Sequence, residues 1–214
     1  MSRERIVAAF AAAPLILVGL TGCSSDSADE SGISLTKQFS QGEIAQALPG
    51  DGEVLPGWES YRGKRVISEG MYCTESANDA SPKGWVRGGS AWFILNGSTK
   101  NMMEIDVCTF DTPNNAKSAY TAWKGTEPDK EKAPIKAVGD EAVLVVNPGL
   151  SKNSVEGFSR SGHVNIRVKV QGTGGDTTGT QDMLAAVLGR LQQVQDGKRA
   201  TVTAGDESAE EAKK

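Results

Sequence analysis

A strict alternation of apolar and polar residues in the stretch "HVNIRVKVQG" constrains the fold more than any other feature. The apolar positions are Val164, Ile166, Val168 and Val170, and the polar ones are Asn165, Arg167, Lys169 and Gln171. Successive side chains of a strand point to opposite faces, so this period of two predicts a strand with one buried and one wet face. The chain must therefore build a sheet that is covered mainly on one side.

Other segments supply partners for this strand. Asn96 and Gly97 separate two apolar runs, and both residues tolerate positive φ, so residues 90–95 are expected to pair with residues 101–110 in a hairpin. The stretch "SVEGFSR" is expected to pair with the alternating strand through a turn at Ser161–Gly162. The run "DEAVLVVN" is predicted to be a central strand that is buried on both faces, and a further strand is expected around residues 65–68.

Three segments carry helix signals. Ser40 followed by Glu43 forms a capping-box pattern. Thr112 and Pro113 suit the start of a second helix whose apolar stripe is Ala116, Ala119, Tyr120 and Trp123. A third helix is expected near residues 181–195, capped by Thr178 or Thr180 after a glycine-rich loop. The order of elements predicts one α+β domain, a twisted antiparallel sheet with helices packed mainly on one face.

The first residues read as a secretory leader. Arg3 and Arg5 precede an apolar run that is short for a membrane span, and Leu20, Thr21, Gly22 and Cys23 resemble the lipobox of bacterial lipoproteins. The resemblance implies cleavage between Gly22 and Cys23 and attachment of a diacylglyceryl group to the Cys23 thiol. Acyl chains would then hold the protein on the lipid bilayer. The alternative is a cysteine buried at the end of a core helix.

These signals divide the chain into four regions. Residues 1–22 are predicted to be the signal peptide, 23–34 a disordered tether, 35–198 the extracytoplasmic domain and 199–214 a disordered tail. The formal net charge is −4, and the leader carries two arginines and one glutamate, so its removal lowers the charge to −5. A mildly acidic chain argues against nucleic acid as a partner, because nucleic-acid binding requires a basic surface.

Cysteine parity points to the same compartment. Once Cys23 is set aside, Cys73 and Cys108 remain, and two thiols outside the membrane are expected to pair as a disulfide. The alternatives are a metal site or a reactive thiol. Neither cysteine has a second cysteine or a histidine nearby in the sequence, and no metal or other cofactor is expected.

Several stretches together resemble a group of actinobacterial lipoproteins and sensor-type extracellular domains. They are "ALPGDGEVLPGW", "DTPNNAKSAYTAW", "APIKAVGDEAVLV", "GFSRSGHVNIRVKV" and "DMLAAVLGRLQQVQ", together with Cys73 and Cys108. The group includes the external sensor domain of a mycobacterial membrane Ser/Thr kinase. The resemblance spans about residues 33–198 and implies an extracytoplasmic lipoprotein with a sensing or binding role. It transfers no catalytic residue.

The sequence shows no catalytic motif. His163 is expected to be an exposed turn residue, and Asp140 a turn residue that sets the entry of the following strand. An enzymatic function would need a hidden cluster, for example Asp140 or Glu141 meeting Asp106 or Glu104 across strands. Trp85, Arg87 and Trp92 are candidates for a ligand site, with core packing or edge shielding as the alternative use of the tryptophans.

We therefore expect a non-catalytic binding or sensor-like module, anchored through acylated Cys23 to the outer face of the cell membrane. Its ligand or protein partner belongs to the cell envelope and is not identified by the sequence. The alternative is an envelope enzyme or accessory factor that acts on cell-wall polymer. A solute-binding component of a transporter fits less well, because such proteins usually need two α/β lobes.

Overall fold

The fold was analysed in a computed structural model, which describes residues 34–68, 73, 80–125, 130–147, 153–172 and 174–206. These residues belong to one compact unit, Ser31–Lys214, and the other unit, Met1–Glu30, lies outside them. The elements are α1 (Gln41–Ala47), β1 (Trp58–Ile67), β2 (Trp85–Leu95), β3 (Ser98–Phe110), α2 (Pro113–Lys124), β4 (Glu131–Lys132), β5 (Glu141–Asn147), β6 (Ser154–Ser161), β7 (Val164–Gln171) and α3 (Thr178–Gln195). A single helical turn follows at residues 204–206.

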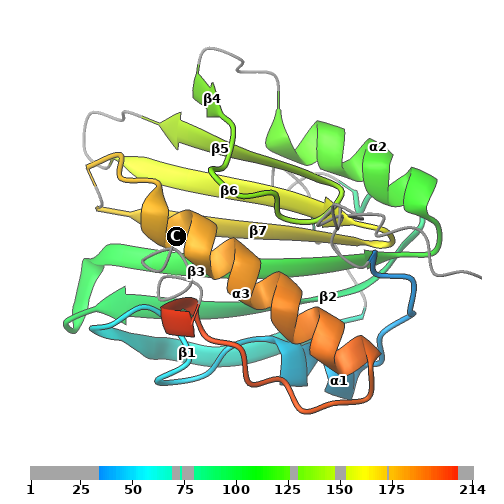
Figure 1. The fold of residues 1–214 in the computed structure, drawn as a ribbon, viewed down its shortest axis with the longest axis horizontal. Helices are drawn as coiled ribbons and strands as arrows, with labels where there is room; N and C mark the ends of the chain where they lie inside the picture. The colour runs from blue at the N-terminus through cyan, green and yellow to red at the C-terminus, as the bar shows by residue number, and fades with distance from the viewer. Residues whose placement is uncertain are drawn as a thin grey trace, which may run out of the picture. The chain divides into compact units, whose positions relative to one another are not determined.

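The strands form one antiparallel sheet in the order β1-β2-β3-β7-β6-β5-β4 (Figure 1). The predicted α+β class with an antiparallel sheet is confirmed. The hairpin between β2 and β3 turns at Asn96 and Gly97, with φ of 50° and 71°, as their sequence predicts. The strand predicted around residues 65–68 is the end of the longer β1. β5 is not central, because only the two-residue β4 lies beyond it.

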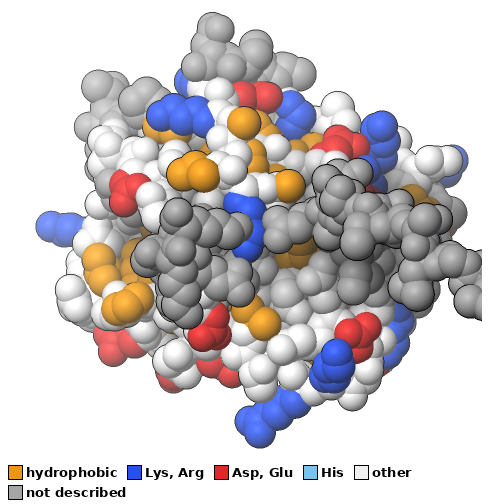
Figure 2. Space-filling view, viewed as in Figure 1, with side chains coloured by type: hydrophobic (Ala, Val, Ile, Leu, Met, Phe, Trp, Pro, Cys, Tyr) orange, Lys and Arg blue, Asp and Glu red, His pale blue; other side chains and the backbone are white. Residues whose placement is uncertain are grey.

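The larger core lies on one face of the sheet, beneath α1 and α3. Figure 1 shows α3 crossing this face, and the alternating apolar side chains of β7 point toward it. Gly157 of β6 allows α3 to approach, since a Cβ there would lie 2.5 Å from a methyl carbon of Leu184. In the space-filling view of this side (Figure 2), acidic and basic side chains are interspersed over the visible described surface.

Arg190 of α3 joins the end of α1 to the segment that follows α3. Its side chain is 2% exposed, and its guanidinium donates to the backbone carbonyls of Ala47, Leu48 and Val202 and pairs with Glu53 at 2.9 Å. Ala200 and Ala204 are buried beside it. The chain beyond residue 198 contacts α3, where Gln193 accepts a hydrogen bond from the Thr201 amide and the Val202 side chain lies beside Gly189.

The smaller core lies on the opposite face, beneath α2. It contains Phe110, Tyr120, Trp123, Val143 and Phe158 together with the Cys73–Cys108 disulfide. α2 starts as predicted, because the Thr112 side chain accepts a hydrogen bond from the Asn115 amide, and Ser40 and Glu43 form the predicted capping box of α1. The predicted cap of α3 is wrong. Thr177 takes the N-cap position without a side-chain bond, and Asp176 accepts from the Thr178 amide instead.

Candidate functional site

Charged side chains line the face of the sheet that α2 covers only in part. We call Glu104, Asp106, Glu156, Arg167 and Lys169 the charged ladder. The strand register places Glu104 and Glu156 on either side of Lys169, and Asp106 directly opposite Arg167. On β3 and β7 these charged positions alternate with apolar residues of the larger core, so the same period of two that builds the core also orders the charges.

The charged ladder contains ion pairs between neighbouring strands. The Arg167 Nη2 atom lies 2.6 Å from Asp106 Oδ2 and 3.4 Å from Glu104 Oε2, and Arg167 Nε also donates to Asp106 at 3.0 Å. The Lys169 Nζ atom lies 2.8 Å from Glu156 Oε1. Opposite charges on facing strand positions stabilise each other, and here the pairing also neutralises groups that are largely withdrawn from water.

Burial shifts the proton affinities of two ladder groups. Burial raises the pKa of Glu104, Asp106 raises it further, and Arg167 acts in the opposite direction. Burial alone would lower the pKa of Arg167, but the charges of Asp106 and Glu104 outweigh it and raise the pKa. Glu104 therefore takes up a proton more readily than a glutamate in water does, while Arg167 stays charged.

A pocket of about 680 Å³ opens where α2 ends above the ladder. Its walls come from the last turn of α2 and its floor from β5, β6 and β7. The lining residues are Thr121, Ala122, Trp123, Lys124, Gly125, Val145, Asn147, Glu156, Phe158, Arg167 and Lys169. The volume falls within the range of small-molecule sites, so this pocket is the candidate binding site.

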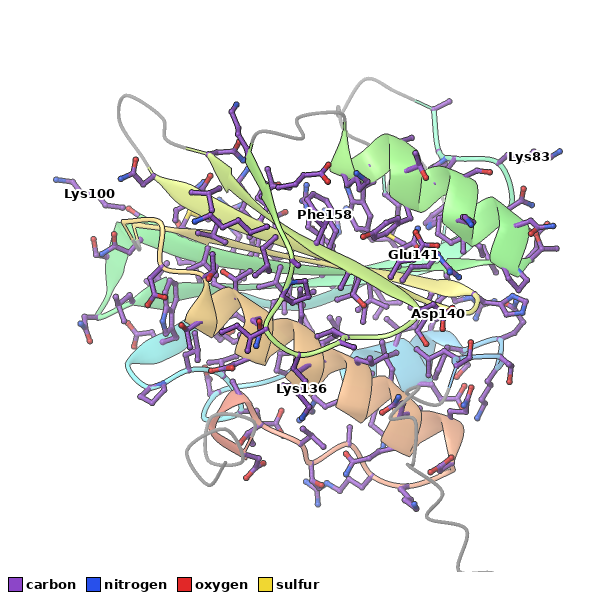
Figure 3. All side chains as sticks on the ribbon, turned by 45° about the horizontal axis from the view of Figure 1, so that its top comes forward. Lys83, Lys100, Lys136, Asp140, Glu141 and Phe158 are labelled. Atoms are coloured by element: carbon purple, nitrogen blue, oxygen red, sulfur yellow. A yellow bond between two sulfur atoms is a disulfide. The ribbon has the colours of Figure 1, made fainter. Side chains whose placement is uncertain are left out.

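The end of α2 is positioned by its apolar stripe. Trp123 is the last residue of that stripe, and its ring meets Phe158 edge to face, with centroids 5.9 Å apart. The guanidinium of Arg167 lies over the Trp123 ring, 5.3 Å from the ring centroid. Gly125 then ends the helix with φ of 71°. Figure 3 shows Phe158 between α2 and the sheet.

The three residues expected to form a ligand site are not brought together. Trp85 pairs with Phe110 at one end of β2 and packs against the smaller core, whereas Trp92 pairs with Glu104 seven residues further along the strand. The continuous register from Arg87 to Trp92 places these two side chains on opposite faces. Trp92 alone lies near the ladder, where its side chain hydrogen-bonds to Glu104.

The carboxylates expected to form a hidden catalytic cluster are also apart. β7 and β6 separate β3, with Glu104 and Asp106, from β5, which begins at Glu141. Asp140 and Glu141 share Arg160, whose nitrogens lie 2.8 Å and 2.9 Å from their respective oxygens, and Asp140 also accepts from the Gly162 amide. Both lie toward the end of the sheet where β5 begins (Figure 3). They hold the β6–β7 turn, which extends the turn role predicted for Asp140.

His163 is not the exposed turn residue that the sequence suggests. It is half-buried, its amide donates to the Leu35 carbonyl at 2.9 Å, and its Nδ1 atom lies 3.2 Å from both Gln38 Nε2 and the Phe110 carbonyl oxygen. The prediction is wrong because Leu35 and Gln38, at the start of the domain, contact this turn. This contact is long-range, so no local sequence pattern indicates it. Leu35 and Phe39 are buried in the same segment.

The cysteines of the sequence analysis fall into two groups. Cys73 and Cys108 are joined by a disulfide with Cα atoms 6.0 Å apart, which is the expected pair. Gly22 and Cys23 lie outside the described residues. Among the residues described, no three His, Cys, Asp or Glu side chains are grouped so that they could hold a metal ion. No helix within that same part of the chain is long and apolar enough to cross a membrane.

The charged ladder is the feature of the candidate site that sequence reasoning missed. The sequence alone predicts a wet face for the polar residues of β7, and it suggests Glu104 and Asp106 only as partners of Asp140 or Glu141. The signal was present in two stretches, "MEIDVC" and "NIRVKV", which carry opposite charges at alternate positions. Finding the ladder required knowing that β3 and β7 are neighbours, although more than fifty residues separate them.

Comparison with known proteins shows a likeness in fold to a solved structure. No protein-family profile matches the chain, and no curated protein sequence matches it. The fold is similar to the crystal structure of the extracellular domain of PknH from Mycobacterium tuberculosis, with a TM-score of 0.47 and 11% sequence identity. The likeness covers 73% of this chain and 98% of that one. The likeness concerns the fold alone, and the function proposed below is derived from this chain's own residues.

Proposed function

We propose that the chain is a membrane-anchored extracytoplasmic lipoprotein whose domain is a non-catalytic, sensor-like binding module. The pocket at the end of α2 carries this proposal. It has the size of a small-molecule site, and its cationic lining groups Lys124, Arg167 and Lys169 are each paired with a carboxylate before any ligand binds. Groups fixed in advance lose little conformational freedom on binding, which favours recognition.

The anchor is supported by the sequence of the leader. A basic start, an apolar run and the lipobox-like residues up to Cys23 occur together, and a disulfide in the domain suits an oxidising compartment outside the cytoplasm. Metabolic labelling with a palmitate analogue tests it. The wild-type chain should carry the label and enter the detergent phase, whereas Cys23→Ser should lose both properties. Labelling of Cys23→Ser at the wild-type level would contradict the anchor.

Binding is tested by native mass spectrometry. The Cys23→Ser chain, secreted from an actinobacterial host and purified gently, should retain a reproducible extra mass that a pocket variant such as Asn147→Trp loses. A bare, disulfide-bonded mass in every preparation would count against small-molecule binding and in favour of a protein partner, which crosslinking on intact cells would then identify.

The alternative function, an envelope enzyme or accessory factor acting on cell-wall polymer, has less support. The carboxylates that it would need lie on separate strands and are held by different arginines, Arg160 and Arg167. Incubation of the protein with purified cell-wall polymer discriminates the two functions. Release of soluble fragments that depends on Glu104 or Asp106 would replace the binding proposal with the enzymatic one.

A further inference from the structure

We propose that the pocket at the end of α2 takes a neutral, polyhydroxylated ligand of the sugar type. This inference rests on the proposed binding function and names the chemistry of its ligand. It follows from two properties of the pocket, the pairing of its charges and the polarity of its open surface.

The charges of the pocket are already balanced. Lys124 lies 2.6 Å from Glu131, Arg167 lies 2.6 Å from Asp106, and Lys169 lies 2.8 Å from Glu156. An anionic ligand would have to compete with a carboxylate for each of these cations and would meet Glu156 in the lining itself. A cationic ligand would face three positive groups. Neither kind of ion finds an uncompensated partner, so the pocket favours a molecule without net charge.

The paired groups still present hydrogen-bonding atoms of both kinds. An ammonium group has three donor positions and a carboxylate has about four acceptor positions, and one ion pair leaves several of them open. Asn147, whose side chain donates to Glu156 at 3.4 Å, adds a group that both donates and accepts, and the Thr121 hydroxyl, which donates to the Lys117 carbonyl, can still accept. A hydroxyl group does both as well, so a set of hydroxyls can bridge the pairs without separating them.

The open surface of the pocket excludes a mainly apolar ligand. The apolar side chains in the lining are turned into the smaller core, with Trp123 6%, Val145 5% and Phe158 4% exposed. The ring face of Trp123 on one side is occupied by the Arg167 guanidinium. A lipid or an aromatic ligand would therefore gain little apolar contact and would cover polar groups without replacing their hydrogen bonds.

Calorimetric titration of the full chain in detergent tests the inference. The neutral probes are N-acetylglucosamine, maltose, cellobiose and chitobiose, and glucuronate and glucose 6-phosphate serve as matched anions. At least one neutral sugar should bind with the tryptophan fluorescence changing in parallel, and the anions should bind at least about tenfold more weakly. Co-sedimentation with an insoluble polysaccharide of the same sugar then separates a polymer-bound glycan from a free sugar as the source.

Two variants locate the binding. Asn147→Ala and Glu156→Gln should each weaken sugar binding by about tenfold, because each removes a hydrogen bond to a polar or charged group. Lys83→Met is the matched control, since Lys83 is exposed and lies at the opposite end of α2 (Figure 3), and it should bind as the wild type does. Melting curves confirm that the variants are folded.

The outcomes separate this inference from the function on which it rests. The sugar assignment would be overturned if only the anions bind. It would also be overturned if no neutral probe binds at a concentration of about 10 mM, which corresponds to very weak affinity. Equal affinity in Asn147→Ala, Glu156→Gln and wild type would overturn the location. If native mass spectrometry meanwhile finds a charged or apolar molecule in the pocket, the binding function stands and only its ligand chemistry is wrong.

Discussion

The two faces of the sheet use the same strands in different ways. On the face beneath α1 and α3, β3 and β7 contribute only apolar side chains to the core between Met103 and Val107 and between Val164 and Val170. On the other face, the alternate positions of these strands carry the charged ladder, and α2 covers only the region beside it. One face is thus closed by hydrophobic packing, and the other is held by α2, a disulfide and ion pairs.

This difference separates stability from recognition. Apolar burial is non-directional and favours complete closure, and the described core beneath α3 is filled by packed apolar side chains. Ion pairs on a half-covered face contribute little net stability but fix polar groups at defined distances. The molecule therefore concentrates its folding free energy on one side of the sheet and keeps an accessible polar surface on the other.

The largest expected contrast comes from truncating one residue on each face of β7. Ile166→Ala removes a fully buried side chain from the larger core and should lower the free energy of unfolding by about 4 kcal/mol, from lost burial and the cavity left behind. Lys169→Ala removes a partly exposed partner of Glu156 and should cost about 1 kcal/mol or less.

Urea unfolding of both variants at pH 7 measures this contrast, with Lys100→Ala at the tip of the β2–β3 hairpin as a control for exposed lysines (Figure 3). Equal losses for Ile166→Ala and Lys169→Ala would mean that the ladder is as important for folding as the core, and the division of roles between the faces would be wrong.

Removal of the disulfide should have the next largest effect. The bond joins residues 35 positions apart and lies on the α2 face, where less apolar surface is buried. In the chain-entropy treatment of cross-links, a loop of this length stabilises the fold by about 3–4 kcal/mol, so Cys73→Ala/Cys108→Ala should lose about that amount. Thermal melting of the double variant tests it, and a melting temperature equal to that of the wild type under oxidising conditions would refute it.

Local signals in the sequence were enough to predict the three longer helices and most of the strands, but not β4 or the first half of β1. The Asn96–Gly97 turn, the Ser40 capping box and the Thr112–Pro113 helix start depend on contacts within a few residues, and the structure contains all three. The alternation in β7 was equally local. The prediction that β5 is a central strand was wrong. An apolar run indicates only that both faces of a strand are buried, and near the edge of the sheet α2 buries one face of β5 without a central position.

The site was less predictable because it depends on strand order. Glu104 and Arg167 meet only because β7 inserts between β3 and β6, and nothing within either segment specifies that neighbour. The same reason explains His163, which is covered by a segment more than a hundred residues earlier in the chain. Pairing of oppositely charged alternating strands is the one sequence signal that could have suggested the ladder.

The smallest and most diagnostic effect concerns pH, and it contrasts Glu104 of the ladder with Glu43 of the α1 cap. Burial raises the pKa of Glu104 above its ordinary 4.5, so the protonated form favours the fold: this stabilisation is present below pH 4.5 and is lost as the pH rises through the raised pKa. Hydrogen bonds from Lys37 and Ser40 lower the pKa of Glu43 to about 2, so its stabilisation is present above pH 4.5 and is lost as the pH falls toward 2.

Glutamine variants should therefore shift the pH profile of stability in opposite ways. In the wild type, the free energy of unfolding should decline between pH 4.5 and 7 as Glu104 ionises, and Glu104→Gln should lack this decline. The stability of Glu104→Gln relative to the wild type should therefore increase with pH. Glu43→Gln should lose less than about 1 kcal/mol at pH 7, since the exposed pair with Lys37 is screened by water, and should equal the wild type near pH 2. Urea unfolding at constant ionic strength measures both. Parallel profiles for the two variants would show that Glu104 is ionised in the fold as easily as a surface glutamate, and the ladder would then be an ordinary wet face rather than a set of groups withdrawn from water.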